Sequence, residues 1–163
     1  ERSDMDFIRG NPPGVAPRDR SLNIRGLPLV KPPWGRISAI DLKTGDIIWQ
    51  IAHGETPDNV REHPDLQGVT IPRTGRPGRV GTLITKTLVI AGEGGTFTTP
   101  SGEVGAMLRA YDKATGVEVG EVYMPASVSG SPMTYMHDGA QYIVLAVNGG
   151  GHPGELLAYR LPE

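Results

Sequence analysis

A short phrase occurs twice in this chain, and this repetition constrains the fold more than any other feature of the sequence. The first copy reads AIDLKTGDIIW at 39–49, and the second reads AYDKATGVEVG at 110–120. A third, partial copy follows near the C-terminus, where LLAY at 156–159 matches LRAY at 108–111. A phrase copied along a chain indicates one supersecondary unit used repeatedly. The sequence therefore predicts a repeat architecture.

The repeated phrase has the chemistry of a strand, a tight turn and a second strand. An alternating apolar run at 36–41 is typical of a half-buried strand. The Asp-x-x-Thr-Gly that follows is a turn signal, because the Asp carboxylate accepts from backbone N–H groups and Gly adopts a positive φ. We therefore expect Asp41 and Asp112 at equivalent hairpin corners, and Trp49 largely buried between two sheets. Such a unit, repeated, indicates the blades of a β-propeller.

The phrase Ala-x-Asp-x-x-Thr-Gly-x-x-x-Trp at 39–49 resembles the tryptophan-docking motif of the pyrroloquinoline-quinone (PQQ) dehydrogenases. In the second copy Gly120 replaces the Trp. Further stretches resemble, in order, the C-terminal part of the glucose-dehydrogenase branch of this family: KPPWGR at 31–36, LRAYD at 108–112, PMTY at 132–135, QYIV at 141–144 and GGH at 150–152. The resemblance covers most of the chain from about Leu27 onward, and it implies an all-β, eight-bladed propeller.

The chain is too short for such a ring. A blade takes roughly 40 to 50 residues and a closed ring about four to eight blades, whereas this chain has 163 residues. We expect an incomplete β-propeller of about two to three blades, as the C-terminal part of a longer protein. A chain that completes a ring with a second chain and a small open β domain are the alternatives. The 23 Gly and 15 Pro residues agree with a turn-rich, all-β chain.

The expected organisation is an irregular segment or long loop at 1–33 followed by the C-terminal blades at 34–163. No sustained apolar alternation is found before residue 34. The later part divides into a blade hairpin at 36–52, a long loop at 53–81, a blade at 82–124 and a last blade at 131–163 that lacks its closing strand. Upstream blades or a second chain would have to complete the ring.

Charge and composition exclude some partners. A net charge of -2 gives no electrostatic footprint for nucleic acid, which is therefore not an expected partner. No stretch approaches the roughly 20 apolar residues of a membrane span. The absence of Cys excludes disulfides and thiolate metal sites. The resemblance implies a periplasmic location, with any signal or anchor upstream of this chain.

Arginines gather in the long loop at 53–81, which is where we expect cofactor chemistry. A loop this long is uncommon unless it is functional or disordered. The resemblance implies PQQ as cofactor, a planar anion with three carboxylates, and a guanidinium binds a carboxylate bidentately. Gly75-Arg76-Pro77 matches the family's Gly-x-Pro, which puts Arg73 or Thr74 where the family carries an Asn that contacts PQQ. We expect Arg73 and Thr74 to bind the cofactor; solvated loop arginines, or arginines that cap backbone carbonyls, are the alternative.

A run of glycines ending in His152 is the candidate substrate site. Glycines let a backbone approach a ligand closely, and a histidine exchanges hydrogen bonds with sugar hydroxyls. The resemblance implies that Gly151 and His152 line the substrate entrance; a flexible turn with an incidental histidine is the alternative. The other histidines, His53 among them, have no spacing typical of a metal site, and we expect them at the surface or in loops.

The family's reaction also needs a Ca²⁺ ion as Lewis acid and an Asp as general base. No residue of this chain matches that Asp or the Ca²⁺ ligands, so we expect the chain by itself to be inactive. The intact protein would oxidise a glucose-like sugar or an alcohol and pass electrons to a quinone or cytochrome. The alternative is a non-catalytic propeller scaffold for protein–protein binding. The arginine-bearing loop and the Gly-Gly-His turn favour the enzyme.

Overall fold

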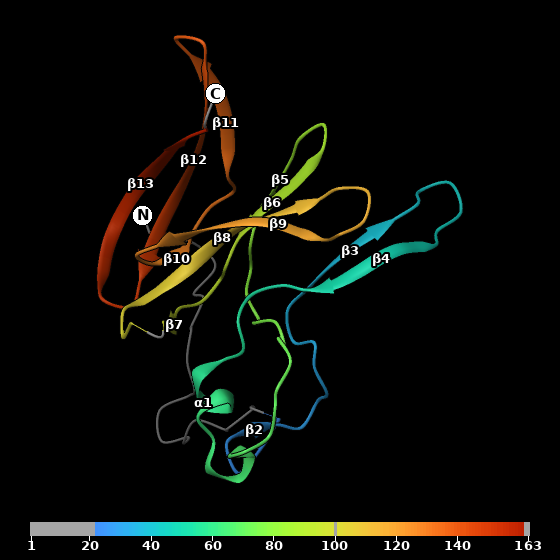
Figure 1. The fold of residues 1–163 in the computed structure, drawn as a ribbon, viewed down its shortest axis with the longest axis vertical. Coiled ribbons are helices and arrows are strands. Elements are labelled where there is room, and N and C mark those ends of the chain that lie inside the picture. Colours follow the sequence, from blue (N-terminus) through green and yellow to red (C-terminus); the bar gives the residue numbers. More distant parts are fainter. Residues whose placement is uncertain (1–21, 100, 162–163) are drawn as a thin grey trace, which may run out of the picture.

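The computed structural model describes residues 22–99 and 101–161, so residues 1–21 of the expected irregular segment lie outside the described residues. Antiparallel strands dominate the fold (Figure 1). Helical structure in the described part of the chain is limited to one turn, α1 (Asp58–Arg61), and a 3-10 turn at Pro64–Leu66. The predicted all-β class with little helix is confirmed.

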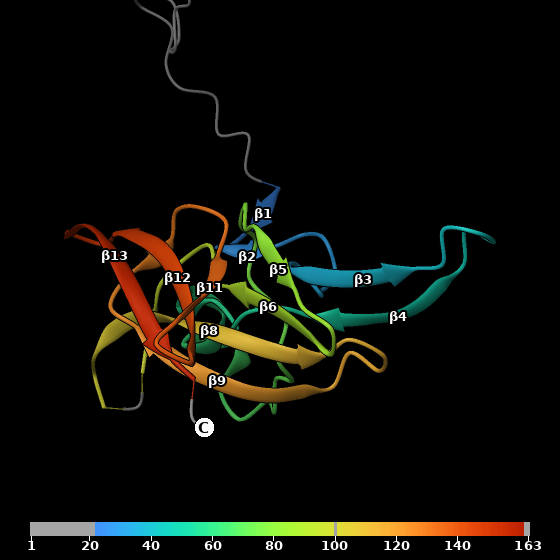
Figure 2. The same ribbon diagram turned by 90° about the horizontal axis from the view of Figure 1, so that it is seen from above.

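The N-terminal strands form two separate hairpins. Strands β1 (Asn23–Ile24) and β2 (Leu27–Pro28) make the first, and β3 (Arg36–Ile40) and β4 (Ile47–Ala52) make the second. Figures 1 and 2 show that the β3–β4 hairpin projects away from the other sheets. The hairpin is connected to the next sheet by the loop at 53–81, which contains α1.

The two copies of the repeated phrase adopt the same turn. The Gly45 N–H donates to the Asp41 carbonyl at 2.7 Å, and the Gly116 N–H donates to the Asp112 carbonyl at 2.8 Å. Each Asp Oδ1 also accepts from the backbone N–H two residues on, at 2.8 and 3.0 Å. The φ angles of Gly45 and Gly116 are 82° and 74°, a conformation that glycine adopts without steric cost. The prediction of equivalent hairpin corners is confirmed.

The middle sheet contains the second copy of the phrase. Its strands β5 (Thr82–Ile84), β6 (Leu88–Gly92), β8 (Val104–Asp112) and β9 (Glu118–Met124) pair in chain order, and the short β7 (Phe97–Thr98) pairs with the start of β8. The last sheet is centred on β12 (Ala140–Gly149), with β13 (His152–Arg160) on one side and β10 (Ser127–Val128) and β11 (Met133–His137) on the other.

The hydrophobic core lies between these two sheets. Inward positions on β6, β8 and β12 are apolar and buried, as the period-two alternation of a strand requires. The segment 124–128, which leads from the middle sheet to the last sheet, adds the buried side chains of Met124, Ala126 and Val128. The main members of the core are Ile90, Leu108, Met124, Val128, Ile143, Leu145 and Val147.

Trp49 is half-buried, so the prediction that it lies largely buried between two sheets is wrong in degree. Its indole packs over the turn at Gly116, where an added Cβ would lie 2.8 Å from the ring carbons, and its Nε1–H donates to the Lys113 carbonyl at 3.1 Å. The indole therefore docks the β3–β4 hairpin onto the corner of the middle sheet. It keeps some exposure because its partner is a turn rather than the face of a second sheet.

Candidate functional site

The two ends of the loop at 53–81 are fastened to the segment that precedes β3. The Trp34 N–H donates to the Thr74 carbonyl at 2.8 Å, the His53 N–H donates to the Gly35 carbonyl at 2.9 Å, and the Arg76 N–H donates to the His53 carbonyl at 2.9 Å. A Cβ added at Gly35 would lie 2.1 Å from the Arg76 carbonyl oxygen, so only glycine permits this approach. The loop therefore returns, at Thr74 and Arg76, to the place where it begins.

Arg73 and Thr74, the predicted cofactor residues, lie at this junction. The Arg73 guanidinium contacts Glu118 Oε2 at 2.5 Å through one terminal nitrogen and Glu55 Oε1 at 3.3 Å through the other. The Thr74 side chain is buried, and its hydroxyl donates to the Gly75 carbonyl at 3.2 Å. Arg73 keeps about a third of its side chain exposed. A bound anion would therefore meet a guanidinium already paired with two carboxylates.

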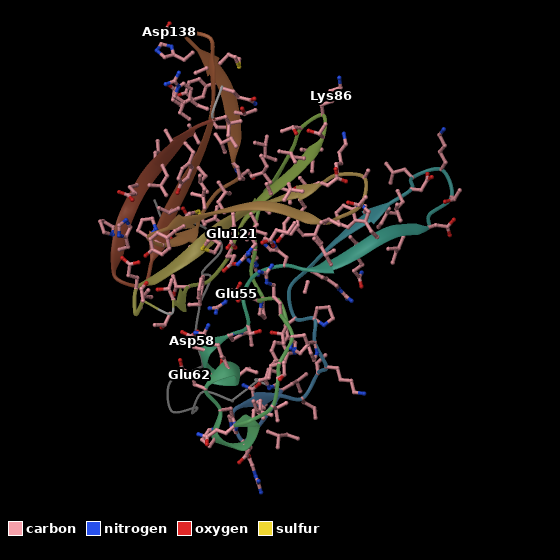
Figure 3. All side chains as sticks on the ribbon, in the orientation of Figure 1. Glu55, Asp58, Glu62, Lys86, Glu121 and Asp138 are labelled. Carbon is pink, nitrogen blue, oxygen red and sulfur yellow. The ribbon has the colours of Figure 1, made fainter. Side chains whose placement is uncertain are left out.

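A second arginine, Arg109 on β8, is the centre of a buried ionic network. Its guanidinium contacts Glu93 at 2.8 Å, Glu55 at 2.7 Å, Glu118 at 2.9 Å and Glu121 at 2.5 Å. The side chains of Arg109 and Glu93 are 1% and 0% exposed. Glu55 approaches from the long loop and Glu121 from β9, as the labels in Figure 3 show. The network thus ties the long loop to the middle sheet.

The network contains more carboxyl groups than guanidinium groups. Burial raises the pKa of Glu93, although its hydrogen bond to Arg109 opposes the rise. Burial would lower the pKa of Arg109, but the hydrogen bond and the charge of Glu93 outweigh it and hold that pKa above its ordinary value. Four carboxyl groups surround only two guanidiniums, those of Arg109 and Arg73. Arg109 is therefore fully paired and closed to a further anion, and only the exposed side of Arg73 is open to one.

Sequence analysis did not identify Arg109 or its partners. The signal that was available is a charged residue inside the apolar run AMLRAY, which forms part of a strand. A buried charge in a protein is paired, so such an arginine predicts acidic partners. It does not predict which ones, because Glu55 and Arg109 are far apart along the chain.

His53 and Tyr111 form a buried pair beside the network. His53 lies in a loop, as predicted, and it is buried there, with 5% of its surface exposed. Its Nδ1 lies 2.9 Å from the Tyr111 hydroxyl and its Nε2 lies 3.2 Å from the Gly92 carbonyl. Burial lowers the pKa of His53 and raises the pKa of Tyr111. Both groups are therefore neutral near pH 7, and the pair joins the end of β4 to β6 and β8.

The glycine turn before His152 has an unusual backbone. Gly149, Gly150 and Gly151 have φ angles of 107°, 64° and 85°, all in the region that other residues rarely adopt. His152 Nε2 lies 3.0 Å from Glu155 Oε1, and the His152 side chain is 28% exposed. The imidazole is therefore partly exposed, but its Nε2 is buried and makes no hydrogen bond with the described residues.

The glycine turn and the long loop approach the same connection between β6 and β7. A Cβ added at Gly150 would lie 3.7 Å from the Thr96 methyl group, and the Arg76 guanidinium donates to the Thr96 carbonyl. Arg76 also lies over the Phe97 ring, 6.0 Å from its centroid. No hydrogen bond or ion pair among the described residues joins Arg73 or Thr74 to His152. The loop that carries Arg73 and Thr74 and the turn that carries His152 thus both contact Thr96, the loop through Arg76 and the turn through Gly150.

Two of the cavities in the described part of the chain lie beside the middle and last sheets. One, of about 540 Å³, lies between the middle and last sheets and is lined mainly by apolar side chains, including Leu88, Ile143 and Leu161. The other, of about 380 Å³, lies where the end of the long loop meets the segment before β11. Arg79 is the one charged residue among those that line it.

Within residues 22–99 and 101–161, no group of three His, Asp or Glu side chains is arranged to hold a metal ion. No helix in that same part of the chain has the length and apolar character needed to cross a membrane.

Comparison with known proteins gives a consistent result. Residues 2–143 match the PQQ family described as glucose/ethanol/alcohol dehydrogenase, β-propeller domain. A probable quinate dehydrogenase (quinone) of Xanthomonas campestris pv. juglandis is 33% identical over 96% of this chain and 19% of its own length. Quinoprotein glucose dehydrogenase A of Acinetobacter calcoaceticus is 32% identical over 85% of this chain and 16% of its own length. The glycerol dehydrogenase large subunit of Gluconobacter thailandicus is 31% identical over 94% of this chain and 20% of its own length. The chain thus spans a fifth or less of the length of these relatives.

Proposed function

The chain belongs to the PQQ-dependent glucose, ethanol and alcohol dehydrogenase family, as part of its β-propeller domain, and on that premise we propose that it forms the C-terminal blades of a dehydrogenase. The intact enzyme would oxidise a hydroxyl group of a sugar, polyol or alcohol and pass the electrons to a quinone or cytochrome. The observation that carries this proposal is the family match over residues 2–143. Upstream blades or a second chain would complete the ring, in the periplasm.

His152 and Gly151 are the proposed substrate residues. The three glycines before it have positive φ angles, and His152 is partly exposed. Its Nε2 is buried beside Glu155, so Nδ1 is the ring nitrogen that would bind a substrate hydroxyl. This arrangement suits recognition of a polyhydroxylated substrate, since each hydroxyl both donates and accepts.

Arg73 and Thr74 stay predicted cofactor residues. When bound, PQQ would supply the quinone that accepts two electrons from the substrate. Arg73 has five N–H donors, and its contacts to Glu55 and Glu118 leave some of them unused on its exposed side. A cofactor carboxylate would still have to compete with two glutamates for that guanidinium. The Ca²⁺ ion and the general base are proposed to lie elsewhere in the intact protein.

The test is PQQ titration combined with dye-linked turnover, on this chain and on the intact protein. We expect the intact protein to bind PQQ and oxidise its substrate, and this chain alone to do neither. His152→Ala should raise the apparent KM and leave PQQ binding unchanged, whereas His137→Ala, at an exposed hairpin tip, serves as the matched control. Arg73→Ala should weaken PQQ binding by about 1.5 to 3 kcal/mol, as expected for a charge-assisted hydrogen bond.

Two results would contradict these assignments. Turnover by this chain alone would show that the catalytic groups lie within it. An intact protein that neither binds PQQ nor oxidises any sugar, polyol or alcohol would favour a non-catalytic scaffold.

A further inference from the structure

One arginine of the long loop, Arg79, has no partner among the described residues. Arg61 contacts Asp58, Arg73 contacts two glutamates, and Arg76 donates to backbone carbonyls. Arg79 makes no hydrogen bond or ion pair within the described part of the chain. A cation without a counter-charge, at the edge of a cleft, is available to a ligand without first breaking an ion pair.

The cleft beside Arg79 is polar and lacks acidic groups. Its volume is about 380 Å³, and its lining comes from two segments: Arg79, Val80 and Gly81 before β5, and Ser129, Gly130 and Ser131 before β11. No Asp or Glu among the described residues lines it. The cleft therefore combines one guanidinium with two serine hydroxyls, in contrast with the acidic network around Arg109.

The backbone on both sides of Arg79 is held by close contacts. A Cβ added at Gly78 would lie 2.8 Å from Gly94 Cα, and one added at Gly81 would lie 2.2 Å from Ser131 Oγ. Glycine at both positions lets the loop press against the connection after β6 and against the segment before β11. Arg79 thus extends from a short stretch fixed at both ends, which reduces the freedom that a ligand would have to remove.

Resting on the proposed function for the identity of the ligands, we propose that this cleft binds a carboxylate through Arg79, with Ser129 and Ser131 as hydroxyl donors. A guanidinium matches a carboxylate with two parallel N–H donors, and each serine hydroxyl adds one further donor. The carboxylate belongs either to PQQ or to an acidic substrate such as quinate, which is a hydroxylated carboxylic acid. A cleft of this kind discriminates quinate from glucose or glycerol, which carry no charge.

Chemical modification of the intact protein tests the site without relying on activity. Phenylglyoxal reacts with accessible arginines, and peptide mass spectrometry reports each arginine separately. We expect Arg79 to react, and PQQ or quinate to slow its reaction, whereas glycerol should have no effect. Arg109 should stay unreacted throughout, because it is 1% exposed. Unchanged reaction of Arg79 with both carboxylate ligands would overturn the proposal.

Substitution then distinguishes the two sources of the carboxylate. Arg79→Gln should weaken PQQ binding, or raise the KM for quinate, by about tenfold or more, as expected for loss of a charge-assisted contact. Arg79→Lys should recover part of the loss, and the KM for glycerol should not change. Lys43→Gln removes one positive charge from the turn of the β3–β4 hairpin and should behave like the parent. An Arg79→Gln protein with the parental PQQ affinity and the parental KM for quinate would refute the site.

Failure of the proposed function would have a different signature. An intact parent protein that shows no PQQ binding and no turnover is not a PQQ dehydrogenase. Protection of Arg79 by quinate would still support the carboxylate site in that protein, and absence of that protection would overturn it.

Discussion

Replacing Arg109 by methionine should destabilise the protein strongly, because the buried Glu93 would lose its ion pair with Arg109. The Glu93 side chain is 0% exposed, and its Oε2 makes no hydrogen bond within the described part of the chain. Breaking a buried ion pair by removing one partner costs about 3 to 5 kcal/mol. The other carboxylates of the network are 24% to 48% exposed and can turn towards water, so we assign most of the loss to Glu93.

A second variant separates the buried charge from the loss of packing. Arg109→Met combined with Glu93→Leu removes both charges, and replacement of a buried ion pair by apolar residues is often neutral or stabilising. We therefore expect the double variant to recover most of the stability that the single variant loses. Urea unfolding followed by circular dichroism measures both variants against the parent.

The pH dependence provides a further check. Burial raises the pKa of Glu93, and Arg109 opposes that rise, so the pKa should be higher still in Arg109→Met. A carboxyl group whose pKa is raised in the folded state destabilises that state only at pH values at which the group is ionised. The stability deficit of Arg109→Met should therefore be small near pH 4.5 and grow as the pH rises to 8 through the folded pKa. A deficit that is equal at both pH values, or a double variant that recovers nothing, would refute the assignment to Glu93.

Three further predictions concern the contacts between the hairpin and the middle sheet. Gly116→Ala should destabilise the protein by about 1 to 2 kcal/mol in urea unfolding, because a Cβ there meets the Trp49 ring and the residue has a left-handed conformation; a variant as stable as the parent would contradict this contact. Trp49→Ala should cost less than the roughly 3 to 5 kcal/mol of a fully buried aromatic deletion, since its indole is only half-buried, and a loss beyond that range would show deeper burial. Burial lowers the pKa of His53 below its ordinary value of 6.5, so its contribution to stability is present above pH 6.5 and is lost as the pH falls through the folded pKa. The difference between His53→Gln and the parent should accordingly narrow on acidification from pH 7 to pH 5, and a constant difference over that range would exclude the histidine as the cause.

The sequence by itself determined the local structure, because the interactions that form it join residues close along the chain. The turn at Asp41 and the turn at Asp112 depend on hydrogen bonds within a few residues and on a glycine at a fixed position. The alternation of apolar residues predicted strands, and the ordered motifs identified the PQQ dehydrogenase family. These features need no knowledge of which strands meet in space.

The tertiary structure alone decided which distant side chains lie together. Arg109 meets Glu55, which precedes it by 54 residues, and His53 meets Tyr111, which follows it by 58 residues. Arg73 and Arg79 occur in the same arginine-rich loop, and their local sequence does not show which of them has acidic partners. One is paired with two glutamates and the other borders a cleft without acidic groups. The reason is physical: the strength and sign of an electrostatic contact depend on distance and burial in three dimensions, which the spacing of residues along a chain does not specify.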